Sequence, residues 1–138
     1  MIKISKATNK DSLTNEWHKV DLPHYGKDVE WIEKKFKFKA MESKKLIGLI
    51  SGKYESGIIY ISTIITRENY RGKGVGGLLI KRVEKFGKKF KAHKMWLITG
   101  KNWSENIFYK KIGFKKIGNL LDFYLHQDFV IYSKDIEY

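Results

Sequence analysis

The segment from Arg71 to Gly77 has the composition of a loop that binds phosphate. Four of its residues are glycines: Gly72, Gly74, Gly76 and Gly77. Glycine lets the backbone approach a ligand and adopt positive φ angles, so that the N–H groups of the loop can converge on an anion. Arg71 and Lys73 add positive charge. An amphipathic pattern follows, and a helix N-terminus there would supply further N–H groups, so we predict a pyrophosphate-binding loop.

Three kinds of phosphate-binding loop have to be distinguished. An ATP-binding P-loop requires Ser or Thr after its Gly-Lys pair, whereas Gly74 follows Lys73. The glycine spacing of a dinucleotide-binding fold is present at Gly72, Gly74 and Gly77. That fold also needs an acidic residue about 20 positions later. Residues 85–103 contain no Asp or Glu, so a nicotinamide cofactor is disfavoured.

The third kind of loop fits the sequence. The spacing Arg71-x-x-Gly74-x-Gly76 resembles the R-x-x-G-x-G loop with which acetyltransferases of the GNAT superfamily bind acetyl-CoA. Residues 102–114 resemble the N-x-x-A-x-x-F-Y-x-x-x-G-F segment of the same family, with matches at Asn102, Phe108, Tyr109, Gly113 and Phe114. Glu105 stands where the family usually has Ala, so the packing of that helix can differ.

The resemblance implies a binding site for the cosubstrate acetyl-CoA. In the family two parallel strands splay apart and the pantetheine arm lies in the gap; here they are 58–66 and 94–99. Backbone groups at Ile64 and Thr66 would pair with the pantetheine amides, and an N–H near Ile64 or Ile65 would polarise the thioester carbonyl. The implied cofactor-binding residues are Ile64, Ile65, Thr66, Arg71, Gly72, Lys73, Gly74, Val75, Gly76, Gly77, Asn102 and Tyr109. No metal site is expected.

The resemblance also implies direct transfer of the acetyl group to an amine, with Tyr109 as the catalytic residue. A phenol with a pKa of about 10 suits a leaving thiolate of similar basicity. The alternative is that Tyr109 is a core aromatic beside Phe108. Asn102 would hold the cofactor or the following helix. The absence of Cys agrees with direct transfer, although a Ser or Thr nucleophile stays open.

The base that deprotonates the amine is not evident. Several family members use a glutamate on the first of the two splayed strands, but Ile61–Ile64 contains no carboxylate. A water relay through Ser62 or Thr63 is one possibility. The other candidates are loop residues: His24, Glu30, Glu33, Glu68 and the cluster His126-Gln127-Asp128.

The acceptor amine is the least specified part of the function. By resemblance its site is built from about Val20–Trp31 and Leu121–Asp128, which are aromatic with a few acids. Such a site could hold a small amine or a peptide N-terminus. The formal net charge of +13 argues against a strongly cationic acceptor and favours CoA, which is itself a polyanion.

The elements that position these residues follow from periodicity and turn residues. We predict strands at 1–7, 36–41, 46–54, 58–66, 94–99, 114–120 and 129–136. We predict helices from Asp11 and Ser12 to Val20, at 28–35, from Gly77 to Lys91, and from a Ser104 cap to Gly113. Pro23 is expected in a loop. Residues 58–66 are almost all β-branched, which indicates a central strand buried on both faces.

This order of elements predicts a single α+β domain over residues 1–138. The sheet should be mixed and mostly antiparallel, with a β-α-β core that binds acetyl-CoA and helices on its flanks. One parallel pair is expected across the glycine loop, and the last two strands should be antiparallel.

Composition narrows the functional classes. The chain has 138 residues, no Cys, no long apolar run and no apolar segment after its first lysines, which favours a cytoplasmic protein without a membrane anchor. Of its 28 basic residues 25 are Lys, which can reflect coding bias rather than a functional basic face. The lysines are spread along every element, so we expect no specific nucleic-acid partner. A basic RNA- or ribosome-binding module and a CoA sensor without activity stay as alternatives, and the chain could be a monomer or a homodimer.

Overall fold

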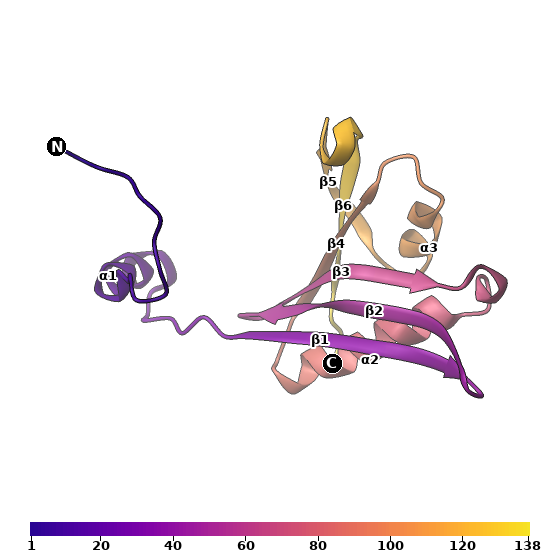
Figure 1. Cartoon of the computed structure of the whole chain (residues 1–138). Coiled ribbons are helices and arrows are strands. Elements are labelled where there is room, and N and C mark those ends of the chain that lie inside the picture. Colours follow the sequence, from indigo (N-terminus) through magenta and orange to yellow (C-terminus); the bar gives the residue numbers. More distant parts are fainter. The chain divides into compact units, whose positions relative to one another are not determined.

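The computed structural model describes all residues, Met1–Tyr138, and divides into two compact units (Figure 1). The smaller unit, Met1–Trp31, contains the helix α1 (Thr14–Tyr25). The larger unit, Ile32–Tyr138, contains a sheet and the helices α2 (Val75–Lys89) and α3 (Glu105–Lys111). The larger unit carries the glycine loop and both sequence motifs. A single domain over the whole chain stays a prediction.

The larger unit is built on one mixed sheet of six strands. They are β1 (Glu33–Glu42), β2 (Lys45–Glu55), β3 (Ile58–Thr66), β4 (Lys94–Gly100), β5 (Lys115–Leu120) and β6 (Phe129–Asp135). Their order in the sheet is β1-β2-β3-β4-β6-β5. Only β3 and β4 are parallel, because α2 crosses from the end of one to the start of the other. The predicted α+β class, the parallel pair and the antiparallel last pair are confirmed.

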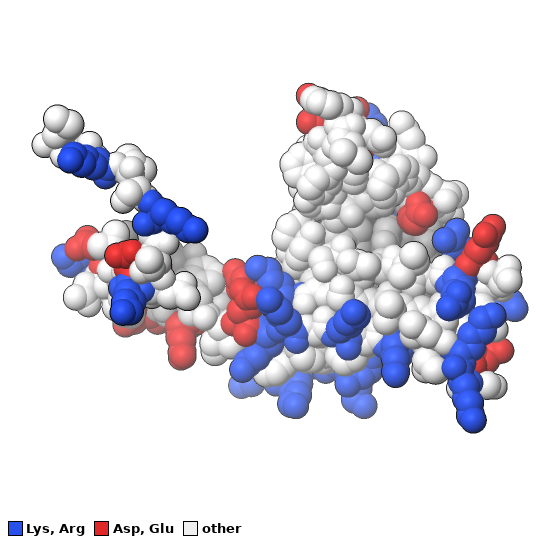
Figure 2. All heavy atoms as spheres, viewed as in Figure 1, with Lys and Arg blue, Asp and Glu red and all other residues white.

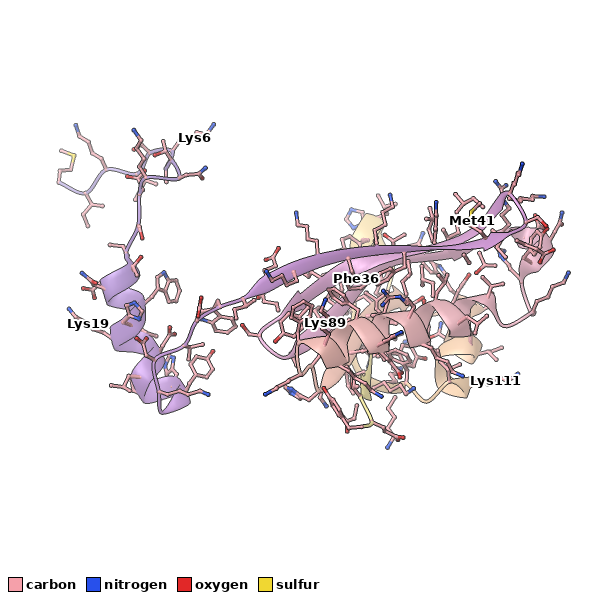
Figure 3. The ribbon with its side chains drawn as sticks, turned by 90° about the horizontal axis from the view of Figure 1, so that it is seen from below. Lys6, Lys19, Phe36, Met41, Lys89 and Lys111 are labelled. Atoms are coloured by element: carbon pink, nitrogen blue, oxygen red, sulfur yellow. The ribbon has the colours of Figure 1, made fainter.

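The hydrophobic core lies between this sheet and α2. Leu79 and Val83 on α2 are buried, and Phe36 of β1 points toward the helix, where its ring lies 5.3 Å from that of Phe86 (Figure 3). Gly87 lets α2 approach the sheet, since a Cβ atom there would lie 3.2 Å from Ile59. Burying one side chain of this size stabilises a fold by about 1.5–3 kcal/mol. This packing fixes the start of α2 next to the end of β3.

Several predictions for the N-terminal part were wrong. Residues 1–7 form no strand, and Ile2 and Ile4 are about 90% exposed. Two isoleucines provide too little apolar surface to hold a strand without a pairing partner. The segment 28–35 is not helical either, because Glu33 already pairs with Glu55 at the start of the long β1–β2 hairpin.

The start and the end of the first helix were also predicted incorrectly. Leu13 occupies the N-cap position of α1 without a side-chain bond, so neither Asp11 nor Ser12 caps the helix. Pro23 lies within the helix rather than in a loop, and because it has no N–H the helix lacks the hydrogen bond that residue 23 would donate to the Lys19 carbonyl. The helix ends at Gly26, which has a φ angle of 73° and donates its N–H to the Leu22 carbonyl.

Candidate functional site

The site begins where β3 and β4 separate. Their parallel pairing covers only Ile58–Tyr60 against Lys94–Trp96, and beyond Tyr60 the two strands diverge (Figure 1). At the same point β3 has a bulge: Ile61 and Thr63 pair with the neighbouring residues Gly52 and Ser51 of β2, which leaves Ser62 unmatched. A bulge bends a strand and increases its twist, which accounts for the divergence. The gap that the resemblance implied is therefore present.

The separation explains why one prediction for β3 was wrong. Ile59 and Ile61 are buried as expected of a central strand, but Ser62 and Thr63 are exposed and Ile65 is 56% exposed. Full burial needs a neighbouring strand and a covered face on both sides, and β4 no longer runs beside this half of β3.

The predicted cofactor-binding residues of β3 lie on this diverging half. The pairing with β2 sets their directions: Ile64 and Thr66 are on the face of the sheet that α2 covers, and Ile65 is on the opposite face. Beyond Tyr60 the backbone edge that faced β4 has no strand partner in the sheet. An extended ligand could therefore add to this edge as a further strand would.

The glycine loop joins the end of β3 to the start of α2. Gly72 and Gly74 have φ angles of 75° and 84°, in the region that favours glycine. Gly74 is the N-cap of α2 and no side chain caps the helix, so the first N–H groups of the helix have no partner. A Cβ atom added at Gly72, Gly74 or Gly77 would meet nothing within 4 Å. These open backbone donors fit a pyrophosphate group.

The other two residues of this turn have packing roles. Val75 is buried and lies against Gly48 of β2. Gly76 faces Phe108 of α3, whose ring would lie 2.9 Å from a Cβ atom at that position. Glycine is thus needed at position 76 for α3 to pack against α2, and only the backbone of these two residues can face a ligand.

Basic side chains surround the loop, and they are held in different ways. Arg71 Nε donates to the Thr66 carbonyl at 3.2 Å, which ties the loop to the end of β3. Lys73 Nζ lies 5.3 Å from the centre of the Tyr70 ring, and Lys45 Nζ lies 5.5 Å from it. A cavity of about 400 Å³ is lined in part by Lys45, Arg67, Arg71, Ile65 and Thr66. The combination favours an anionic ligand.

Tyr109 lies on the side of the sheet that also holds α2. Only 5% of it is exposed, and its ring lies 5.8 Å from Phe114 and 5.9 Å from Tyr132. Burial, and to a smaller extent the Glu105 carboxylate one turn earlier, raises the pKa of Tyr109 to about 12. The phenol therefore stays protonated throughout the neutral range. Its buried position agrees with the core-aromatic alternative, and its role as proton donor stays a prediction.

Two asparagines near α3 have different surroundings. Asn102, which sequence reasoning selected, is exposed and lines a cavity of about 240 Å³ with Trp103 and His126. Asn106, which it missed, holds the start of α3: Nδ2 donates to the carbonyls of Gly100 at 2.8 Å and Trp103 at 2.6 Å, and Oδ1 accepts from the Tyr132 hydroxyl at 2.7 Å. The sequence pattern around Asn106 did not indicate that its side chain would hold the start of the helix. Ser104, by contrast, makes no capping bond.

The segment between β5 and β6, Leu121–Asp128, is called here the hairpin loop. Three of its residues have positive φ although none is glycine: Asp122 (49°), Leu125 (54°) and His126 (59°). The loop is held by its own polar groups. Asp128 Oδ1 accepts from the Asp122 N–H at 2.9 Å, and His126 Nδ1 lies 2.8 Å from Asp122 Oδ1.

The candidate bases have separate positions. Glu33 lies 3.7 Å from Lys53 in an ion pair, and Glu68 lines the larger cavity. His126 is oriented by Asp122 and lines the same cavity as Asn102. His24 and Glu30 belong to the smaller unit. Two of these residues share a cavity with predicted cofactor-binding residues: Glu68 with Ile65, Thr66 and Arg71, and His126 with Asn102.

Two further features were searched for. No group of three or more His, Cys, Asp or Glu side chains could hold a metal ion. None of the helices has both the length and the apolar character required to span a bilayer.

Comparison with known proteins identifies the class. A mixed sheet whose two central parallel strands separate beside a glycine loop and a helix N-terminus defines an α+β fold of the acetyltransferase type. Residues 7–114 match the model of the acetyltransferase (GNAT) family, and the chain belongs to that family. No curated protein matches the sequence.

Solved structures show the same fold. An acetyltransferase from Bacillus cereus is 18% identical, with 97% of both chains covered and a TM-score of 0.70. An aminoglycoside 6'-N-acetyltransferase complexed with coenzyme A is 16% identical over 75% of this chain and 74% of its own, with a TM-score of 0.68. The ribosomal-protein-S18-alanine N-acetyltransferase from Escherichia coli is 16% identical over 75% and 70%, with a TM-score of 0.67.

Proposed function

We propose that this protein is an acetyl-CoA-dependent N-acetyltransferase that transfers the acetyl group directly to a primary amine of a small molecule, or to the N-terminus or a lysine of a peptide or protein. The observation that carries the proposal is the separation of β3 from β4 after Tyr60, with the glycine loop and the open N-terminus of α2 at the end of β3. Similar folds include a transferase complexed with coenzyme A, which supports the same ligand here.

The binding roles follow from what each part of the site can offer. The backbone of Ile64, Ile65 and Thr66 would pair with the pantetheine amides along the free edge of β3. The N–H groups from Gly72 to Gly77 would hold the pyrophosphate, and Lys73 would add charge. Arg71 has a second task, because its bond to Thr66 also fixes the loop against β3. Asn102 would contact the cofactor from the start of α3.

The chemical step needs one group to polarise the thioester carbonyl and another to protonate the leaving thiolate. A backbone N–H of β3 just beyond the bulge at Ser62 would donate to the carbonyl oxygen. Tyr109 would donate its proton to the sulfur. Its raised pKa keeps it protonated but makes it a weaker acid than an ordinary phenol, so the transfer requires the thiolate to form in contact with the hydroxyl, where burial excludes water.

The acceptor amine must lose a proton. No carboxylate stands on β3 near the bulge, so we assign this task to His126, oriented through Asp122 and acting directly or through water. With Nδ1 held by the Asp122 carboxylate, Nε2 is left to accept a proton. The hairpin loop would in this way supply both the base and part of the acceptor site.

An acetyl-CoA turnover screen with free-thiol detection tests the proposal. The purified chain is offered amines, amino acids and peptides, and acetyl-CoA affinity is measured in parallel by calorimetry. We expect binding and amine-dependent thiol release. Binding without turnover on any acceptor would favour a CoA sensor, whereas absence of binding would overturn the assignment of the glycine loop.

A further inference from the structure

One face of the sheet is apolar without belonging to the core. On β4 the side chains of Met95 and Leu97 point into the core, so Trp96 and Ile98 point to the other face. The register places further apolar residues beside them on that face: Tyr60 opposite Trp96, Ile131 opposite Ile98, and Phe129 opposite Gly100. This set of five side chains (Tyr60, Trp96, Ile98, Phe129 and Ile131) is called here the outer face.

The outer face is mostly aromatic, and the hairpin loop extends it. The rings of Tyr60 and Trp96 are 4.5 Å apart. The Tyr124 ring lies 5.2 Å from Phe129 and 4.5 Å from Phe123. The loop tyrosine therefore borders the outer face through Phe129, which lies on that face. Tyr124 is 57% exposed and free to contact a ligand.

The outer face offers little to a polycation. Carboxylates on the bordering elements already have partners. Glu55 lies 3.0 Å from Lys53, Asp135 lies 2.8 Å from Lys94, Asp122 holds His126, and Asp128 accepts an N–H. In the view of Figure 2, Lys and Arg gather along β1, while the visible surface over β4, β5 and β6 shows few charged side chains. Two of these carboxylates have a lysine beside them, which would repel an acceptor with several positive charges.

The outer face reaches the point where the acetyl group would be presented. Tyr60 and Trp96 form the last pair before β3 and β4 separate. Tyr109 and α2 lie on the inner side of the sheet, so the acetyl donor and the acceptor would approach the gap from opposite faces. An acceptor bound against Tyr60 and Trp96 would have its amine at the start of that gap.

We propose that the acceptor is a small aralkylamine: one primary amine joined by a short alkyl link to an aromatic ring, with the ring bound by Tyr60, Trp96 and Tyr124. This inference rests on the proposed N-acetyltransferase function. Stacked or edge-to-face rings attract one another beyond the burial of apolar area, which favours an acceptor with a ring over one with only an alkyl chain. An apolar surface also lowers the pKa of a bound amine, so the missing carboxylate on β3 matters less for this class of acceptor.

The test compares four acceptors that each carry one amine, and adds one polycation. Phenethylamine and tryptamine are offered beside butylamine and ethanolamine, each with one amine, and beside the polycation spermidine. We expect kcat/KM for the two aralkylamines to exceed that for the other monoamines by at least about tenfold, and spermidine to be the poorest. A preference for spermidine or ethanolamine would overturn the inference while leaving the acetyltransferase intact.

Variants locate the preference. Tyr124→Ala removes an exposed ring and should lower kcat/KM for tryptamine roughly 10- to 100-fold, with little change for butylamine and unchanged acetyl-CoA affinity. Trp96→Leu, which keeps an apolar side chain but removes the aromatic ring, should act in the same direction. Met41→Ala removes an exposed apolar side chain at the far end of β1 and serves as the matched control (Figure 3). An equal loss for all amines in Tyr124→Ala would contradict ring recognition. If no amine is turned over although acetyl-CoA binds, the proposed function fails first.

Discussion

The glycine loop and the hairpin loop use positive φ angles in opposite ways. In the glycine loop both residues with positive φ, Gly72 and Gly74, are glycines, so the left-handed backbone is free of steric strain. In the hairpin loop Asp122, Leu125 and His126 adopt the same region with side chains attached. For Leu125 this conformation costs about 1–2 kcal/mol. The first loop exposes its backbone, whereas the second exposes side chains.

This difference matches the two ligands that we propose. A pyrophosphate is the same in every acyl-CoA and is bound best by N–H groups, which need no side chain. An acceptor is specific to one enzyme and is recognised by side chains, which a loop must hold in fixed directions. Strain in a loop persists only where surrounding contacts enforce it, and here the Asp122–His126 and Asp128–Asp122 contacts do so.

The largest effect is expected at Tyr109, which belongs to neither loop. Tyr109→Phe keeps the ring against Phe114 and Tyr132 and removes only the hydroxyl. We expect kcat to fall about 10²–10⁴-fold with unchanged acetyl-CoA affinity, because the proton is needed only in the transition state. Steady-state kinetics and calorimetry measure the two quantities. Full turnover in a folded variant would mean that Tyr109 has a packing role and is not the proton donor.

The pH profile gives a second test of the same residue. An acid works only while protonated, and a pKa of about 12 keeps Tyr109 protonated well beyond pH 10. The rate at saturating acceptor should therefore show no alkaline decline near pH 10, where an ordinary phenol ionises. The same shift contributes to stability. The contribution is complete below the unfolded pKa of about 10 and is lost as the pH rises through about 12. Wild type should therefore lose stability between pH 8 and pH 11, whereas Tyr109→Phe, which has no phenol to ionise at this position, should be spared this loss.

The next largest effect is expected from a substitution in the glycine loop. Gly74→Val places a β-branched side chain at a φ angle of 84° in front of the open N–H groups, and we expect acetyl-CoA affinity to fall at least about tenfold, or 1.4 kcal/mol. Part of the change is conformational strain. Gly26→Val supplies the control: Gly26 has a similar φ of 73° and equally open surroundings, but lies at the end of α1. If Gly26→Val weakens acetyl-CoA affinity as much as Gly74→Val does, the loss does not come from the glycine loop.

The contrast between the loops also marks what sequence could reveal. The strands from 58 to 66 and 94 to 99 were predicted closely, since β-branched runs act locally. The helix after the glycine loop begins two residues earlier than predicted, at Val75. The hairpin loop left no such pattern, because Leu125 is not a residue from which positive φ is expected. Asn106 was missed for a related reason: its three hydrogen bonds depend on how Gly100, Trp103 and Tyr132 meet in space.

Pairing explains the other differences. The segment 28–35 has a helical pattern, but Glu33–Lys35 pair with β2 because the β1–β2 hairpin continues through them. The exposure of Ile65 could not be inferred from a run of β-branched residues, since it results from the departure of β4 and the bulge at Ser62. Local propensity indicates that a strand forms, and tertiary context decides which faces are covered.

A smaller effect is expected when the basic side chains of the glycine loop are removed. Lys73→Ala should weaken CoA binding a few-fold and reduce its dependence on salt, since a solvated cation near phosphate is screened at high ionic strength. Arg71→Ala should cost more, because the bond to the Thr66 carbonyl is lost as well. Titrations at 50 and 500 mM salt measure both. Lys116→Ala, on β5, is the control for net charge.

The smallest effect tests the hairpin loop. Leu125 is 90% exposed, so its replacement forfeits almost no packing, and Asn tolerates the left-handed region far better than Leu. Leu125→Asn should therefore stabilise the protein by about 0.5–1 kcal/mol, seen as a rise of a few degrees in Tm. Leu121→Asn is matched, since Leu121 is also exposed in this loop but is not among the residues with positive φ. Equal Tm changes in the two variants would mean that Leu125 is not strained. If the strain serves acceptor binding, Leu125→Asn should also raise KM for the acceptor while acetyl-CoA affinity stays constant. A gain in stability together with that loss would show that the loop keeps a strained side chain for its contact with the acceptor.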